Sequence, residues 1–126
     1  MPRTLDDFFQ EALQTVKEVT VQEAQRILEQ GDHLVLDVRE PDEYLYGRLP
    51  GATNIPRGWL EVKADLVHPK RDPILEDRSQ KILCYCGGGY RSALAAKTLQ
   101  EMGFEHVVSM RGGWSQWIAE RLPVEK

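Results

Sequence analysis

Two short apolar runs constrain the fold of this chain more than any other feature. Residues 34–38 (Leu-Val-Leu-Asp-Val) and 81–86 (Lys-Ile-Leu-Cys-Tyr-Cys) are almost continuously apolar, which is typical of parallel strands covered on both faces. We expect further strands at 16–19, 52–55 and 106–109, with helical patterns between them. This alternation predicts an α/β fold, in which a mostly parallel open sheet of about five strands has helices on both faces.

The N-terminal segment adds a helix before this pattern. Apolar residues recur at helical spacing between residues 5 and 16, and Thr4 is suited to begin a helix. We therefore expect an amphipathic helical extension over residues 1–15, packed on its own domain, and the α/β domain over residues 16–126. Residues 68–80 are polar and predict a loop or lid.

Composition excludes several classes of partner. The 126 residues carry a formal charge of −4 without a basic cluster, which argues against nucleic-acid binding. No apolar run approaches the ~20 residues that a membrane span needs. Two cysteines are too few and too close for a disulfide framework, which fits a cytoplasmic protein. We expect a monomer or weak homodimer with no cofactor. The three histidines, His33, His68 and His106, are each expected in a surface loop and lie far apart in the sequence, so we expect no metal site.

The run Cys-Gly-Gly-Gly-Tyr-Arg-Ser, which begins at Cys86, points to the chemistry. Cys86 ends an apolar strand, three glycines turn the chain, and Arg91 opens the next helix. The thiol then faces backbone N–H groups and the positive end of a helix, which both favour the thiolate. The sequence therefore predicts a nucleophilic cysteine that acts on an anionic substrate.

Three segments in order resemble the rhodanese-type sulfurtransferases. They are residues 36–56 (Leu-Asp-Val-Arg-Glu-Pro-Asp-Glu-Tyr, then Gly-Arg-Leu-Pro-Gly-Ala-Thr-Asn-Ile-Pro), residues 86–93, and residues 103–114, which end in Arg-Gly-Gly-Trp. The resemblance implies a rhodanese-like fold, and a Cys86 that takes a sulfane sulfur from thiosulfate or a persulfide donor and holds it as a persulfide. Cyanide, a thiol or a protein acceptor then receives the sulfur, and a protein donor fits the same chemistry.

The resemblance also implies roles for the neighbours of Cys86. The active-site loop would cradle the anionic donor with its backbone N–H groups, and it consists of Gly87, Gly88, Gly89, Tyr90, Arg91 and Ser92. Arg91 either binds the donor, which is the favoured role, or ties the loop to a carboxylate. Supporting residues would hold the wall of the site, through pairs such as Arg39 with Glu43, and they are Asp37, Arg39, Glu43 and Trp114. Trp59 is a further candidate for this wall.

Two other functions stay open at this point. A phosphatase or arsenate reductase also uses a cysteine, a backbone cradle and an arginine, but five residues separate the two in those enzymes and only four do here. A non-catalytic sulfur-carrier or binding module is the other alternative, and the retained Cys86 argues against it. We expect the neighbouring Cys84 to be a buried structural residue.

Overall fold

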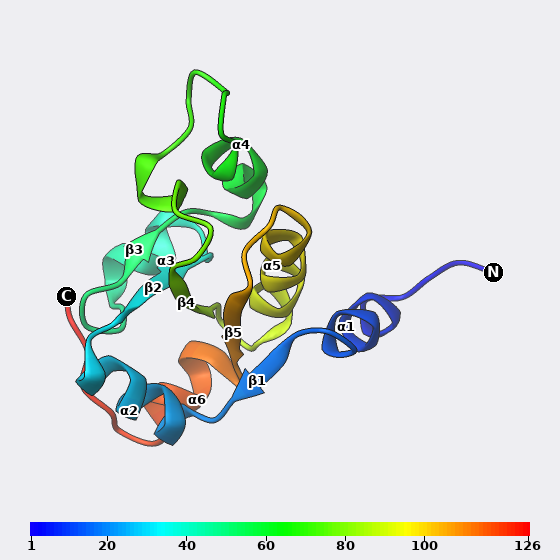
Figure 1. The fold of residues 1–126 in the computed structure, drawn as a ribbon. Helices are drawn as coiled ribbons and strands as arrows, with labels where there is room; N and C mark the ends of the chain where they lie inside the picture. The colour runs from blue at the N-terminus through cyan, green and yellow to red at the C-terminus, as the bar shows by residue number, and fades with distance from the viewer.

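The computed structural model describes all 126 residues and contains one five-stranded sheet flanked by helices (Figure 1). The elements follow in the order α1 (Leu5–Leu13), β1 (Lys17–Val19), α2 (Val21–Gln30), β2 (His33–Asp37), α3 (Pro41–Tyr46), β3 (Thr53–Asn54), η1 (Arg57–Trp59), α4 (Leu60–Ala64), η2 (Pro73–Leu75), β4 (Lys81–Tyr85), α5 (Tyr90–Glu101), β5 (His106–Met110) and α6 (Gly113–Ala119). The two η elements are single turns of 3-10 helix.

The sheet confirms the expected α/β architecture. Its strand order is β1-β5-β4-β2-β3, and every pair of neighbouring strands is parallel. Central β4 pairs with β2 and β5, so that Cys84 lies between Leu36 and Ser109. Because all strands run the same way, their carboxyl ends share one edge, where open α/β sheets bind ligands. Cys86 follows β4 at that edge.

Side chains alternate between two cores, one on each face of the sheet. Cys84 and Cys86 belong to the core that includes residues of α4 and α5, whereas Leu83 and Tyr85 belong to the core that includes residues of α2 and α6. This period of two is the geometry of an extended strand. The fully buried Trp117 of α6 belongs to the second core.

Helix α1 packs along α5, and the chain before it extends away from the body of the domain (Figure 1). Reciprocal hydrogen bonds between Thr4 and Asp7 begin the helix. It ends at Leu13, so the expectation of a helix over all of residues 1–15 was too long. Ala12 is fully buried, and the side chain of Gln100 in α5 donates to the Thr15 carbonyl at 2.9 Å.

The expected places of two histidines need correction, and the expected loop over residues 68–80 needs refinement. His33 and His106 are the first residues of β2 and β5, so the expectation that each lies in a surface loop was wrong. Residues 68–80 are mostly loop but include η2, and Leu75 in that turn is fully buried. This anchor fixes the middle of the segment to the domain. No helix is long and apolar enough to cross a membrane.

Candidate active site

The Cys86 side chain lies under its own loop with only 1% of its surface exposed. The Gly89 N–H donates to the sulfur at 3.1 Å, and the Ser92 hydroxyl lies 3.4 Å from it. Gly89 has a φ of +106° and a Cβ there would lie 3.3 Å from the Gly112 nitrogen, so a side chain at this position meets strain and crowding. The loop therefore presents the Gly89 N–H to the sulfur at close range.

Helix α5 and strand β5 complete the polar surroundings of the sulfur. The 12-residue helix begins at Tyr90, and its positive N-terminal end lies beside the loop. Fully buried Ser92 shares a hydrogen bond of 2.8 Å with fully buried Ser109. Ser109 was missed by the sequence interpretation, although a hydroxyl near the end of an apolar strand at the ligand-binding edge is a detectable signal.

Arg91 ties the loop to helix α3. Its guanidinium donates to both carboxylate oxygens of Glu43, at 2.8 and 3.2 Å. The Arg91 hydrogen bond lowers the pKa of the Glu43 carboxyl, and the same bond raises the pKa of Arg91. The less favoured of its two expected roles, contact with a carboxylate, is the one that the structure contains. A Cβ on Gly87 would lie 2.8 Å from the Arg91 guanidinium, so a side chain there would require the flexible end of Arg91 to shift.

Asp37 and Arg39 form a buried ion pair behind the loop. The Arg39 guanidinium donates to the Asp37 carboxylate at 2.7 and 3.1 Å and to the Gly47 carbonyl at 2.7 Å. The Tyr85 hydroxyl donates to the same carboxylate at 2.6 Å. The expected pairing of Arg39 with Glu43 was therefore wrong. Burial works against the charged form of Arg39, but Asp37 outweighs it and raises the arginine pKa; burial also raises the pKa of Tyr85 well above its usual range.

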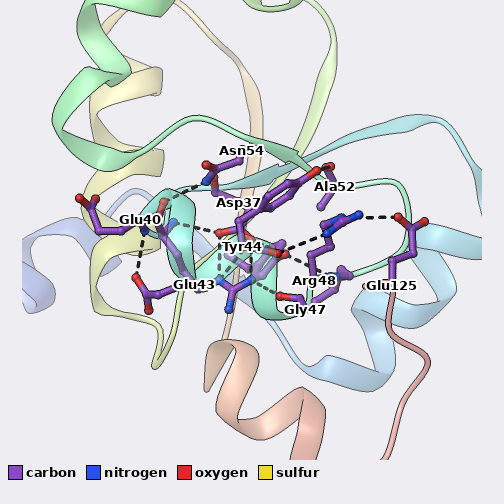
Figure 2. Close-up of polar contacts among 12 residues, drawn as sticks. Asp37, Glu40, Glu43, Tyr44, Gly47, Arg48, Ala52, Asn54 and Glu125 are labelled. Carbon is purple, nitrogen blue, oxygen red and sulfur yellow. Dashed lines mark hydrogen bonds and ion pairs between the residues drawn. The ribbon is translucent and has the colours of Figure 1, made fainter.

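Figure 2 shows the polar contacts around Asp37, which link α3, β3 and the C-terminal tail. Asn54 of β3 donates to the Asp37 carbonyl at 3.0 Å, and the Tyr44 hydroxyl of α3 donates to the Ala52 carbonyl at 2.7 Å. Arg48 lies 3.7 Å from the Glu125 carboxylate in the tail. These contacts fix the residues that surround the buried pair.

The start of α6 is hydrogen-bonded to the active-site loop through its backbone N–H groups. Trp114 and Ser115 donate their backbone N–H groups to the Cys86 and Gly87 carbonyls, at 2.8 and 3.0 Å. Gly113 adopts a φ of +58°, and a Cβ there would lie only 2.5 Å from the Cys86 carbonyl oxygen. The Trp114 ring stacks on the Arg39 guanidinium at 4.7 Å. Trp114 therefore connects the loop with the buried pair.

Trp59 lines a cavity of about 400 Å³ together with residues of β3, α4 and the 68–80 segment. Asn54, which donates to the Asp37 carbonyl, lines the same cavity, whereas no residue of the active-site loop does. The place of Trp59 in the wall of the site stays a prediction. No group of three His, Cys, Asp or Glu side chains is arranged to hold a metal ion.

The fold and the cysteine loop define a class of sulfur-handling α/β domains, and comparison with known proteins identifies the family. A family model of the rhodanese-like domain matches residues 20–120. The chain belongs to the rhodanese-like family. The thiosulfate sulfurtransferase GlpE of Pseudoalteromonas translucida is 30% identical over 103 residues, which are 82% of this chain and 90% of that protein. A mouse thiosulfate sulfurtransferase/rhodanese-like domain-containing protein 3 is 30% identical over 117 residues, covering 89% of this chain and 74% of that protein.

Solved structures agree with this placement. A protein of unknown function from Rhodopseudomonas palustris, described as a possible tyrosine phosphatase, is 34% identical and superposes with a TM-score of 0.93, covering 99% of this chain and 96% of that one. A rhodanese-related protein from Thermoplasma volcanium is 28% identical with a TM-score of 0.70, covering 86% of this chain and 97% of that one. The first of these matches spans α1 as well as the family domain.

Proposed function

We propose that this protein is a sulfurtransferase that works through a persulfide on Cys86. The Cys86 thiolate attacks the outer sulfur of thiosulfate or of a persulfide donor, and sulfite or a thiolate leaves with the electron pair of the broken S–S bond. A nucleophile such as cyanide or a thiol then attacks the outer sulfur of the persulfide and releases the Cys86 thiolate. The cycle needs no redox cofactor, because the sulfane sulfur passes between nucleophiles.

One observation carries this proposal: the Cys86 sulfur is buried under its loop, where it accepts a backbone hydrogen bond and lies beside the positive end of a helix. The Gly89 N–H at 3.1 Å and the α5 N-terminus would stabilise the negative charge of an anionic persulfide at the same place. The Ser92 hydroxyl at 3.4 Å is a further polar neighbour. The thiosulfate sulfurtransferases among the relatives support the same chemistry.

The electrostatics of the loop favour a donor of low charge. Arg91 is the loop's one cationic side chain, and the Glu43 carboxylate offsets its charge. Thiosulfate carries two negative charges and gains little from a guanidinium that is already paired. We therefore expect the persulfide of a small thiol to be a better donor than thiosulfate.

The description of the R. palustris protein makes a phosphatase the second candidate. Four residues separate Cys86 from Arg91, one fewer than in the cysteine-dependent phosphatases, and a shorter loop suits a sulfur atom better than a tetrahedral oxyanion. The pairing of Arg91 with Glu43 also weakens its hold on a phosphate. Hydrolysis of an aryl phosphate that disappears in Cys86→Ser is the result that supports this alternative.

The test is the intact mass of the protein after incubation with thiosulfate and, separately, with glutathione persulfide. We expect the wild-type chain to gain one sulfur atom and to lose it on addition of cyanide. Cys84→Ser is the matched control, because Cys84 is a buried cysteine two residues earlier on the same face of β4, and it should behave as the wild type. A chain that gains no sulfur from either donor, or that still gains it in Cys86→Ser, contradicts the proposal.

A further inference from the structure

Only two side chains of the active-site loop reach solvent beside Cys86. The three glycines have no side chain, and Ser92 is fully buried. Tyr90 is 46% exposed and the Arg91 side chain 39% exposed. These two residues are therefore the side chains of the loop that an incoming reactant can meet, since the Cys86 sulfur itself is almost completely covered.

Each of these two side chains is held by a different element. Arg91 is held by Glu43 of α3, which lies inside the family domain. Tyr90 is held by Phe9 of α1, whose ring meets the Tyr90 ring edge to face with centroids 4.8 Å apart and planes at 61°. This is a favourable geometry for an aromatic pair. The second contact comes from residues that precede the matched family domain at 20–120.

The position of Phe9 is fixed by the packing of its helix. Fully buried Ala12, one turn further along α1, anchors the helix, and Glu11 lies 3.6 Å from the Lys97 ammonium of α5. The adjacent Phe8 points elsewhere, since it is 44% exposed and stacks with the Arg3 guanidinium at 4.1 Å. Of the two neighbouring phenylalanines, Phe9 is the one paired with the loop.

We propose that Phe9 is a positioning residue that acts through Tyr90 to set which reactants reach Cys86. Held by Phe9, the Tyr90 ring narrows the approach to the sulfur and favours small reactants over bulky ones. Helix α1 then contributes to the active site, although it precedes the matched family domain. This inference deepens the proposed sulfur transfer and rests on it for its biological role. What it states physically is how easily a reactant reaches the Cys86 thiol.

The test measures alkylation of Cys86 by two reagents with the same reactive group, iodoacetamide and a bulky fluorescein iodoacetamide. Because the reaction at sulfur is the same, the ratio of the two rates reports access rather than nucleophilicity. We expect Phe9→Ala to raise the bulky-to-small ratio by about three- to tenfold, the range that corresponds to loss of one aromatic pair. Phe9→Leu keeps an apolar side chain for the packing of α1 and should raise the ratio less.

Two controls make this expectation falsifiable. Phe8→Ala removes a neighbouring ring that is not paired with the loop and should leave the ratio unchanged. In a Tyr90→Ala background, Phe9→Ala should add nothing further, since the two rings act as a unit. An unchanged ratio in Phe9→Ala, the same rise in Phe8→Ala, or additive effects with Tyr90→Ala would each overturn the inference.

The alkylation experiment needs no sulfur donor, so it separates this inference from the proposed function. If the chain transfers no sulfur but the ratio changes as expected, the proposed function fails and the positioning role stands. If sulfur transfer occurs with an unchanged ratio, the reverse holds. In an active protein, we expect Phe9→Ala to lower the KM for glutathione as acceptor with little change in the KM for cyanide.

Discussion

Two arginine–carboxylate pairs lie near the ligand-binding edge of the sheet and differ mainly in their contact with water. Asp37 and Arg39 are 2.7 Å apart, with side chains 0% and 3% exposed. Glu43 and Arg91 are 2.8 Å apart, with side chains 37% and 39% exposed. The two ion pairs therefore have nearly the same length, but one is shielded from water and the other is in contact with it.

The difference teaches that burial, rather than distance, decides what each pair does. A buried charge that loses its partner stays costly because water cannot reach it, whereas an exposed charge is solvated again. The Asp37–Arg39 pair is thus a fixed part of the structure behind the loop. The Glu43–Arg91 pair is an adjustable part of the site, whose loss changes the local charge more than the fold.

The largest effect is expected when the buried pair is broken from one side. Arg39→Met leaves the Asp37 carboxylate buried without its main partner, and we expect it to lower the free energy of unfolding by about 3–5 kcal/mol. Urea denaturation measures this change. Arg111→Met is the control, because its ion pair with Glu18 is largely exposed on the arginine side and should cost less than about 1 kcal/mol. Equal costs for the two variants would show that burial does not separate the pairs.

A smaller effect is expected when only a hydrogen bond to the buried pair is removed. Tyr85→Phe takes one donor from the Asp37 carboxylate and leaves the Leu49 N–H without its acceptor. Unsatisfied buried groups of this kind cost about 1–3 kcal/mol each, so a loss within that range is expected in the same denaturation measurement. Tyr46→Phe removes a hydroxyl from a side chain that is 85% exposed and should have no measurable effect. A loss no greater than that of Tyr46→Phe contradicts the expectation.

The smallest change in stability is expected for the exposed pair, together with a change in substrate binding. Glu43→Gln should alter the free energy of unfolding by less than about 1 kcal/mol. It frees the Arg91 charge, so we expect the KM for thiosulfate to fall by about threefold or more, as a charge-assisted contact becomes available. Steady-state kinetics with thiosulfate and cyanide measure the change. A KM that rises, with stability unchanged, would mean that Glu43 orients Arg91 for the donor rather than competing with it.

The pH dependence of stability tests the contribution of the exposed Glu43–Arg91 pair separately from that of the buried pair. The Arg91 hydrogen bond lowers the pKa of Glu43 in the folded protein below its ordinary value of about 4.3. The stabilisation by this pair is therefore complete above the ordinary pKa and is lost as the pH falls through the folded-state value. We expect the difference in unfolding free energy between wild type and Glu43→Gln to be constant from pH 6 to 8 and to shrink in acid. A difference that does not shrink as the pH falls through the folded-state pKa of Glu43 would have to come from something other than this pair.

The sequence predicts the parts of this molecule that follow from local pattern. Continuous apolar runs place β2 and β4 in the middle of a parallel sheet, and the strand end before the glycines places Cys86 at its ligand-binding edge. The glycine at position 89 is required by a positive φ that follows from the turn itself. These features depend on residues that are neighbours in the sequence.

The pairings of side chains depend on packing between distant elements, and the sequence predicts them poorly. Arg39 and Asp37 are only two residues apart, but Arg39 pairs with Asp37 rather than with Glu43 at a place where the Asp37 carboxylate is buried and also receives the Tyr85 hydroxyl of β4. Glu43 reaches Arg91 only because the first turn of α3 lies against the start of α5. The contact of Phe9 with the loop follows in the same way from how α1 packs on α5. Nothing in the spacing of these residues fixes such distances.

The seating of the loop on α6 has a consequence for how the chain is made. Trp114 and Ser115 donate hydrogen bonds to the carbonyls of Cys86 and Gly87, yet they follow Cys86 in the chain only after α5 and β5. During synthesis from the N-terminus, Cys86 therefore emerges from the ribosome before the residues that support its loop. The supported conformation of the loop can form only once the start of α6 has been made.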